Sequence, residues 1–136
     1  MKMIIAIAAG LLLAAAQAAE VAVVVNPKAG VDSLSPEQIA NLFLGKATSF
    51  PNGAVAAPVD QNEGPVRDDF DNKVLKKDAA GVKAHWAKMQ FTGKGNPPKE
   101  IGNSADVKKH VAGNPNAIGY IEKSAVDGSV KVVGSF

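Results

Sequence analysis

The chain contains no cysteine, and this absence excludes several chemistries. No disulfide can form, so we expect a core that is stable without covalent cross-links. Thiol catalysis and thiolate metal sites are excluded as well. The two histidines, His85 and His110, are too far apart for a local metal-binding motif. The stretch Gly93–Gly95 is too short for a nucleotide-binding loop. We therefore predict neither a metal site nor a cofactor.

An excess of one charge sign is also absent. The 15 Lys and Arg residues nearly balance the 13 Asp and Glu residues, which gives a formal net charge of +2 at pH 7. The basic residues are spread along the chain instead of forming one block. Proteins that bind nucleic acid concentrate basic side chains on one surface, so nucleic acid is not expected as a partner.

Catalytic patterns are scarce. Neither histidine has an obvious catalytic partner, and the sequence has no nucleophile elbow. Asp68, Asp69 and Asp71 fall in a predicted helix, where adjacent side chains point in different directions, so they do not form a catalytic pair. Favourable interaction with the helix dipole is a sufficient reason for their position. We predict that the chain is not an enzyme, and a small hydrolase is the weakest alternative.

Long hydrophobic runs are missing too. Lys2 precedes an apolar stretch from Ile4 to Ala16, which is shorter than the roughly 20 residues that a membrane-spanning helix needs. Ala16–Ala18 has the small-x-small pattern of a cleavage site. We predict a signal peptide at residues 1–18, export to the periplasm, and a single domain over residues 19–136. Membrane association would then occur only through partners.

Strand and helix patterns alternate along the remainder. The β-branched run Val21–Val25 predicts a strand buried on both faces. Ser35 and Gln38 form a capping box around Pro36, which predicts the start of a helix. Further strands are predicted at 55–59, 117–121 and 130–133, further helices from about 65, 79 and 103, and a loop at 91–99. This order predicts an α/β fold with a mixed, mostly parallel sheet flanked by helices on both faces.

The stretch after the second predicted strand carries the strongest functional signal. The run Val55–Val59 is predicted to end at Asp60, and a helix is predicted to begin near Pro65. Ligands of open α/β sheets bind beyond the carboxyl ends of strands, and a helix N-terminus suits an anion. The candidate ligand-binding residues in this stretch are Asp60, Gln61, Asn62, Gly64 and Arg67.

Several segments, in order along the chain, resemble one known family. Leu34–Lys46 and the turn Pro51–Gly53 resemble the phosphate ABC transporter periplasmic substrate-binding proteins, and Phe91–Gly95 and Gly113–Glu122 continue the resemblance. It implies a single lobe of the type 2 periplasmic-binding fold, whereas full-length members close two such lobes around an oxyanion. The phosphate-binding loop of the family typically reads Ser-Asp-Gly-Ser-Gly-Thr. Here Gly64 is kept and the hydroxyls are not.

The resemblance implies a secreted, non-enzymatic substrate-binding-like domain that serves transport. It would bind a small oxyanion such as phosphate at the loop after the second strand, and its partner would be a membrane permease complex. The altered loop and the single lobe support an alternative. In that alternative the chain kept the fold, lost the ligand, and acts as a structural or interaction protein with a partner in the cell envelope.

Overall fold

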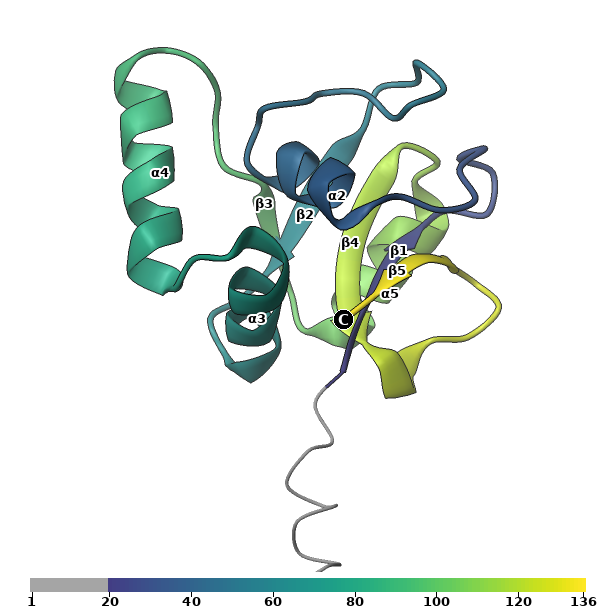
Figure 1. The fold of residues 1–136 in the computed structure, drawn as a ribbon. Coiled ribbons are helices and arrows are strands. Elements are labelled where there is room, and N and C mark those ends of the chain that lie inside the picture. The colour runs from purple at the N-terminus through teal and green to yellow at the C-terminus, as the bar shows by residue number, and fades with distance from the viewer. Residues whose placement is uncertain (1–19) are drawn as a thin grey trace, which may run out of the picture.

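The computed structural model describes residues 20–136, so the predicted signal peptide lies outside the described residues. Figure 1 shows how the elements are arranged. In chain order these are β1 (Val21–Val25), α2 (Pro36–Phe43), β2 (Ala57–Gln61), α3 (Pro65–Phe70), the π-helical segment η1 (Asp71–Leu75), α4 (Ala79–Phe91), β3 (Lys99–Gly102), α5 (Ser104–Gly113), β4 (Ala117–Glu122), the 3-10 turn η2 (Lys123–Ala125) and β5 (Lys131–Ser135). Within residues 20–136, no helix combines the length and the apolar character needed to cross a bilayer.

The five strands form one mixed sheet in the order β3-β2-β4-β1-β5. Strand β2 runs parallel to both β3 and β4, while β1 is antiparallel to β4 and to β5. Four strands therefore share one direction and only β1 opposes them. This arrangement confirms the predicted mixed, mostly parallel sheet.

Strand β1 divides the interior into two cores. Its five residues are at most 1% exposed, as predicted for a strand buried on both faces. Val21, Val23 and Val25 contribute to a core shared with α2, α3 and α4, whereas Ala22 and Val24 contribute to a core shared with α5. This division follows from the alternation of side chains along a strand. Helices α2 and α3 lie in front of the sheet and α5 lies behind it, so helices cover both faces (Figure 1).

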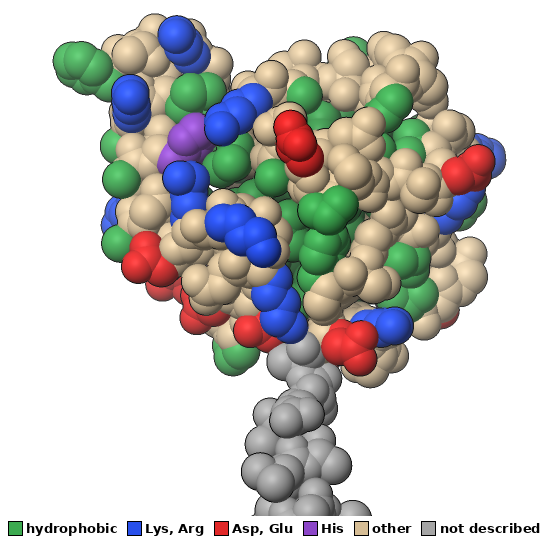
Figure 2. Space-filling view, viewed as in Figure 1, with side chains coloured by type: hydrophobic (Ala, Val, Ile, Leu, Met, Phe, Trp, Pro, Cys, Tyr) green, Lys and Arg blue, Asp and Glu red, His purple; other side chains and the backbone are tan. Residues whose placement is uncertain are grey.

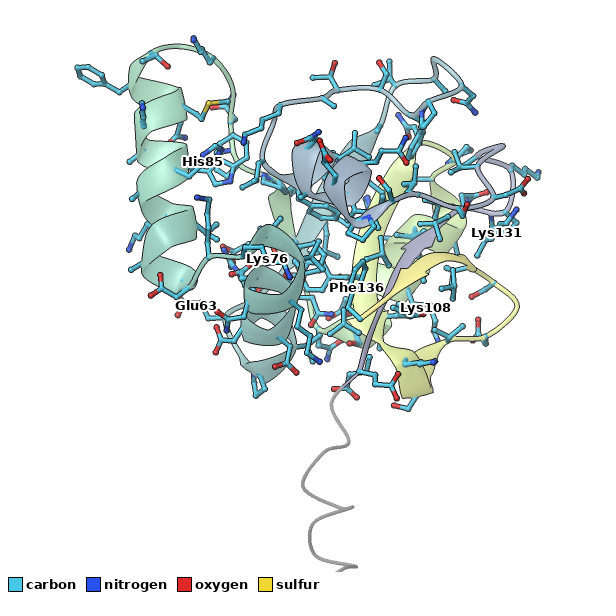
Figure 3. All side chains as sticks on the ribbon, in the orientation of Figure 1. Glu63, Lys76, His85, Lys108, Lys131 and Phe136 are labelled. Carbon is cyan, nitrogen blue, oxygen red and sulfur yellow. The ribbon has the colours of Figure 1, made fainter. Side chains whose placement is uncertain are left out.

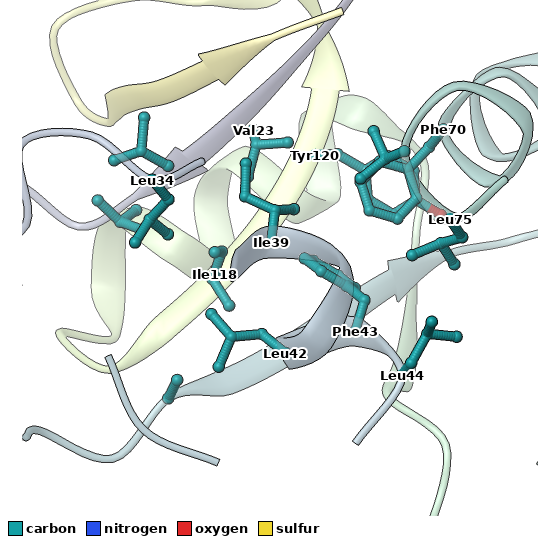
Figure 4. Close-up of a cluster of buried hydrophobic side chains, with 14 of the residues drawn as sticks. Val23, Leu34, Ile39, Leu42, Phe43, Leu44, Phe70, Leu75, Ile118 and Tyr120 are labelled. Atoms are coloured by element: carbon teal, nitrogen blue, oxygen red, sulfur yellow. The ribbon is translucent and has the colours of Figure 1, made fainter. Parts of the chain in front are cut away.

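Three aromatic rings pack together in the larger core (Figure 4). The rings of Phe70 and Tyr120 are stacked, with centroids 3.9 Å apart, and Phe43 meets both rings edge-on. Burying a side chain of this size stabilises a fold by roughly 1.5–3 kcal/mol. Tyr120 lies on β4 and Phe70 on α3, so this contact fixes α3 against the sheet where the candidate site lies.

Helix α2 begins as the sequence predicts. The Ser35 hydroxyl accepts a hydrogen bond from the Gln38 N–H at 3.1 Å, and the Gln38 side chain accepts one from the Ser35 N–H at 2.9 Å. Pro36 occupies the first helical turn, where a missing N–H has no cost. Leu34 and Ile39, on either side of the cap, are both buried. The helix thus presents its apolar face to the sheet.

Two predictions about the middle of the chain need correction. Strand β2 covers Ala57–Gln61 instead of the predicted 55–59. Asp60 and Gln61 continue the ladder with β3, whereas Val55 is 64% exposed and lies in an isolated bridge with Ser49. Strand β3 itself was not predicted. Its sequence gave no strand signal, because it is a short edge strand whose first two residues, Lys99 and Glu100, are exposed. The helix that begins at Pro65 changes to π-helical geometry at Asp71.

Candidate ligand-binding crevice

A crevice of about 470 Å³ opens at the carboxyl ends of the parallel strands. Its walls are the loop 61–67 after β2, the segment 102–105 at the start of α5, and the side chains of Glu122 and Ala125. Two helices, α3 and α5, thus begin at the same crevice. This position is the one at which open α/β sheets bind ligands.

The predicted site residues divide into two groups. Gln61, Asn62, Gly64 and Arg67 line the crevice. Asp60 does not line it, because its carboxylate turns inward toward Tyr120 and the residue is only 8% exposed. The structure therefore brings four of the five predicted residues to the crevice wall and places the fifth beneath it.

The start of α3 offers unpaired backbone donors. Gly64 is the N-cap residue and no side chain caps this end. The first N–H groups of a helix have no acceptor within the helix. Because Pro65 has no N–H, the free donors in this turn belong to Val66 and Arg67, both of which line the crevice. This end of α3 can therefore donate hydrogen bonds to an anion.

The start of α5 adds a hydroxyl that sequence reasoning missed. Asn103 caps the helix by accepting a hydrogen bond from the Asp106 N–H at 3.1 Å. Next to it, the Ser104 hydroxyl oxygen accepts from Gln61 Nε2 at 3.1 Å and from the Glu122 N–H at 3.2 Å. With both acceptor positions used, the hydroxyl proton of Ser104 is left to donate. Only the pairing of β3 with β2 reveals that Ser104 lies beside the loop.

Arg67 is held by three protein acceptors. Its Nη1 donates to the Gln61 carbonyl and to the Glu100 carboxylate, both at 3.1 Å, and its Nη2 lies 3.5 Å from Asp60 Oδ2. Burial opposes the charge of Arg67, but the carboxylates of Asp60 and Glu100 outweigh it and raise the pKa of the guanidinium. Arg67 is therefore charged, and it joins α3 to β2 and β3.

Beneath the crevice, Asp60 and Tyr120 form a buried pair. The Tyr120 hydroxyl donates to Asp60 Oδ1, and the Gln61 N–H donates to the same carboxylate oxygen at 3.0 Å. Burial raises the pKa of Asp60, although the hydrogen bond from Tyr120 and the charge of Arg67 oppose the rise. Burial and the neighbouring Asp60 carboxylate also raise the pKa of Tyr120. The tyrosine therefore remains a hydrogen-bond donor.

A second buried carboxyl lies in the π-helical segment η1. Asp71 is only 2% exposed. Burial, followed by the charge of Asp60, raises the pKa of Asp71 to about 7. The sequence placed Asp71 in a helix but gave no sign that it would be buried. A π-helical turn displaces side chains from the 3.6-residue period, so period-based reasoning misplaces residues in it.

The histidine on α4 contacts neighbouring residues of the protein. His85 Nε2 lies 2.8 Å from the Leu44 carbonyl oxygen, and its ring meets Trp86 edge-on. Figure 3 shows His85 directed from α4 toward the end of α2. Within residues 20–136, no three His, Asp or Glu side chains are grouped to hold a metal ion.

Several solved structures of phosphate-transport proteins are similar in fold to this chain. No protein-family model and no curated protein matches the chain by sequence. A protein from Clostridium perfringens, assigned as a phosphate ABC transporter substrate-binding protein and solved with bound phosphate, is 28% identical with a TM-score of 0.64. A phosphate transport receptor from Vibrio cholerae is 21% identical with a TM-score of 0.56, and PstS from Borrelia burgdorferi is 11% identical with a TM-score of 0.61.

These matches cover 85% of this chain but only 45%, 46% and 47% of the respective matched chains. The chain thus spans about half the length of the structures it resembles. Residues 20–136 have the fold of a phosphate-type substrate-binding protein, which confirms the predicted resemblance and the predicted fold class.

Proposed function

We propose that this protein is an exported, non-enzymatic binding domain that takes a small oxyanion, such as phosphate, in the crevice between α3 and α5. The convergence of two helix N-termini and the Ser104 hydroxyl on one crevice carries the proposal. Backbone N–H groups at a helix start and an adjacent hydroxyl are suitable donors for a phosphate-sized anion. The bound phosphate in the Clostridium perfringens protein of the same fold supports this choice of ligand.

The charges around the crevice determine which protonation state of an anion can bind. Glu63 and Glu122 line the crevice together with Arg67. A carboxylate repels a fully ionised anion but accepts a hydrogen bond from a protonated one. Phosphate carries such a proton at neutral pH and sulfate does not, so we expect phosphate to bind more tightly. One lobe leaves the ion partly solvated, and the affinity will be weak unless a partner covers the crevice.

Within this proposal the five predicted residues have different roles. Gly64 leaves the start of α3 open, Asn62 lines the crevice, and the buried Gln61 holds the Ser104 hydroxyl in place through its side-chain amide. Arg67 supplies positive potential while it holds the Gln61 carbonyl. Asp60 acts from below, because its carboxylate fixes the position of the Arg67 guanidinium.

Calorimetry with phosphate and sulfate tests the proposal. Ser104→Ala and Arg67→Ala should each weaken phosphate binding by about tenfold, since each removes roughly one hydrogen bond or charge interaction with the ion. Ser33→Ala is the matched control, because Ser33 is exposed and does not line the crevice. If phosphate binds with the same affinity to both crevice variants and to the control, the anion does not occupy this site.

One observation favours a second function, that of an envelope interaction protein without a ligand. The Arg67 guanidinium already faces Gln61, Glu100 and Asp60, so the protein can satisfy this group with the crevice empty. Under this alternative, a permease complex or another envelope protein is the partner. Failure of phosphate to raise the melting temperature at any concentration, with a specific partner cross-linked in the periplasm, would establish it.

A further inference from the structure

The sheet ends in an unpaired strand. Strand β3 pairs with β2 on one side, and on its other side no strand follows within residues 20–136. An edge strand presents a row of free N–H and C=O groups that can pair with another extended chain. The four residues of β3 could form such a ladder with a peptide of similar length.

Helix α4 forms a groove with this end of the molecule. The groove has a volume of about 590 Å³ and is lined by α4, by the start of α3 with Glu63 before it, by Pro97 of the loop before β3 and by Glu100 of β3. Figure 1 shows α4 beside β3, at the edge of the sheet farthest from β5. Figure 3 shows Glu63 near the start of α3 and close to the lower end of α4.

The base of the groove is apolar, and the side chains of α4 that line it are small. Val82 and Trp86 lie at the base and are largely buried, with 5% and 7% exposure. Ala80 and Ala87 line the same wall and are exposed. Small side chains along α4 leave room for the side chains of an occupant between the helix and the strand.

We propose that this groove binds an extended peptide segment of a partner protein, which adds a strand to the free edge of β3. Main-chain hydrogen bonds to β3 would provide affinity, and side chains on one side of the peptide would lie against the exposed Ala80 and Ala87 of α4. This is the geometry of β-augmentation, in which a peptide pairs with a sheet edge and pockets select alternate residues. The inference is independent of anion binding in the crevice.

Charge selects the kind of peptide. The groove is lined by Glu63, Asp68 and Glu100 against Arg67 and Lys83. Arg67 is already paired with Glu100 and with Asp60, which is buried. The remaining lining charge is negative at the α3 end of the groove, so a peptide with a basic residue at that end is favoured over an acidic one.

The edge itself argues for a peptide over a second copy of this chain. Strand β3 is short and begins with exposed Lys99 and Glu100, which are features that discourage sheet-to-sheet pairing between whole domains. Helix α4 also covers one side of the groove. A narrow extended segment can enter where a second folded sheet cannot.

A phage-displayed library of random seven-residue peptides, panned against the exported protein, tests the proposal. Selected peptides are then measured by calorimetry and by nuclear Overhauser contacts to the β3 amides. Ala87→Trp fills the groove, and Ala84→Trp is the matched control, because Ala84 is an exposed alanine of the same helix that does not line the groove.

We expect the selected peptides to be basic and to make cross-strand contacts with residues 99–102. Compared with the wild-type protein, Ala87→Trp should bind them at least about tenfold more weakly, and Ala84→Trp should bind them equally well. The absence of any selected peptide overturns the proposal. Peptides that bind Ala87→Trp normally, or that contact residues outside the groove, also overturn it. So does a concentration-dependent dimer that protects β3 without peptide, because the occupant is then a second copy.

Discussion

At the scale of single residues, a small set of buried polar groups organises the end of β2. Asp60 receives hydrogen bonds from Tyr120 and from the Gln61 N–H, and it faces Arg67 across 3.5 Å. Buried charges are tolerated when they are paired and hydrogen-bonded in this way. The contribution of these groups to the free energy of unfolding depends on which of them are protonated. It can therefore be measured as a change of stability with pH.

The pKa of Asp71 predicts a pH-dependent stability. The folded protein holds this proton more tightly than the unfolded chain, whose carboxyl has the ordinary pKa of 3.8. Stability from this group is therefore full below pH 3.8 and falls as the pH rises toward about 7. The loss is at most about 4 kcal/mol, because a pKa difference of one corresponds to roughly 1.4 kcal/mol. Above that range the contribution is constant.

Urea denaturation across this pH range, with Asp71→Asn as the comparison, measures the effect. The variant should lose most of the decline and be more stable than the wild type above pH 7. A residual decline of the same sign is expected from Asp60, whose pKa burial also raises. An identical decline in wild type and variant would show that folding does not raise the pKa of Asp71.

Tyr120→Phe tests the hydrogen bond beneath the crevice. The phenylalanine keeps the ring stacked on Phe70 but removes the donor to Asp60. Asp60 keeps the Gln61 N–H and Arg67 as partners, but removing one hydrogen bond to a buried carboxylate costs roughly 1–3 kcal/mol, so we expect a loss of that size in the free energy of unfolding at pH 7. A variant as stable as the wild type would mean that Asp60 is protonated or solvated instead.

The candidate residues show how far sequence reasoning reaches at this scale. Gly64 and Arg67 could be chosen because a βα junction has recognisable chemistry in the sequence itself. The inward turn of Asp60 could not be foreseen, because its partner Tyr120 is 60 residues away on another strand. Ser104 was missed for the same reason, since its neighbour Gln61 belongs to a different element.

At the scale of elements, some helices and strands are determined by their own sequence and others by pairing with a neighbouring element. Helix α2 follows from its own sequence, because capping residues and a period of apolar positions coincide. Strand β3 depends on its neighbour, since pairing with β2 defines it and its exposed residues carry no apolar alternation. Edge strands are therefore harder to predict than buried ones such as β1.

Ser35→Ala tests the cap of α2. Loss of the hydroxyl leaves the Gln38 N–H without its side-chain acceptor, and a cap of this kind contributes about 1 kcal/mol. Ser33→Ala is the control, because Ser33 is an exposed serine of the preceding loop. Chemical denaturation should show the loss only for Ser35→Ala. Equal stability of the two variants would assign no energy to the cap.

Gly119→Ala tests the packing of β4 against α5. A Cβ at this position would lie 2.6 Å from Val107 Cγ1 and 3.1 Å from Val59 Cγ2. Such overpacking costs roughly 1–3 kcal/mol, so we expect a lower melting temperature. Gly128→Ala, where an added Cβ meets nothing within 4 Å, should leave the melting temperature unchanged. An undisturbed Gly119→Ala protein would show that α5 moves away without cost.

At the scale of the whole molecule, residues 20–136 form one lobe, with the crevice at the carboxyl ends of its parallel strands. Figure 2 shows several basic side chains close together on the α4 and α3 side of the visible face, with acidic side chains mainly toward its lower rim. The matched transport proteins are about twice as long, so this chain corresponds to about half of each of them. The proposal of weak anion binding follows from this geometry.

The most direct test is a phosphate titration of the isotope-labelled protein, followed by the backbone amide signals in NMR. If the crevice is an oxyanion site, the amides of Val66, Arg67, Ser104 and Ala105 will shift together and saturate, and sulfate will produce smaller shifts at equal concentration. If those four amides stay fixed while phosphate rises, or if only scattered lysine-rich surfaces respond, the crevice between α3 and α5 is not an anion-binding site.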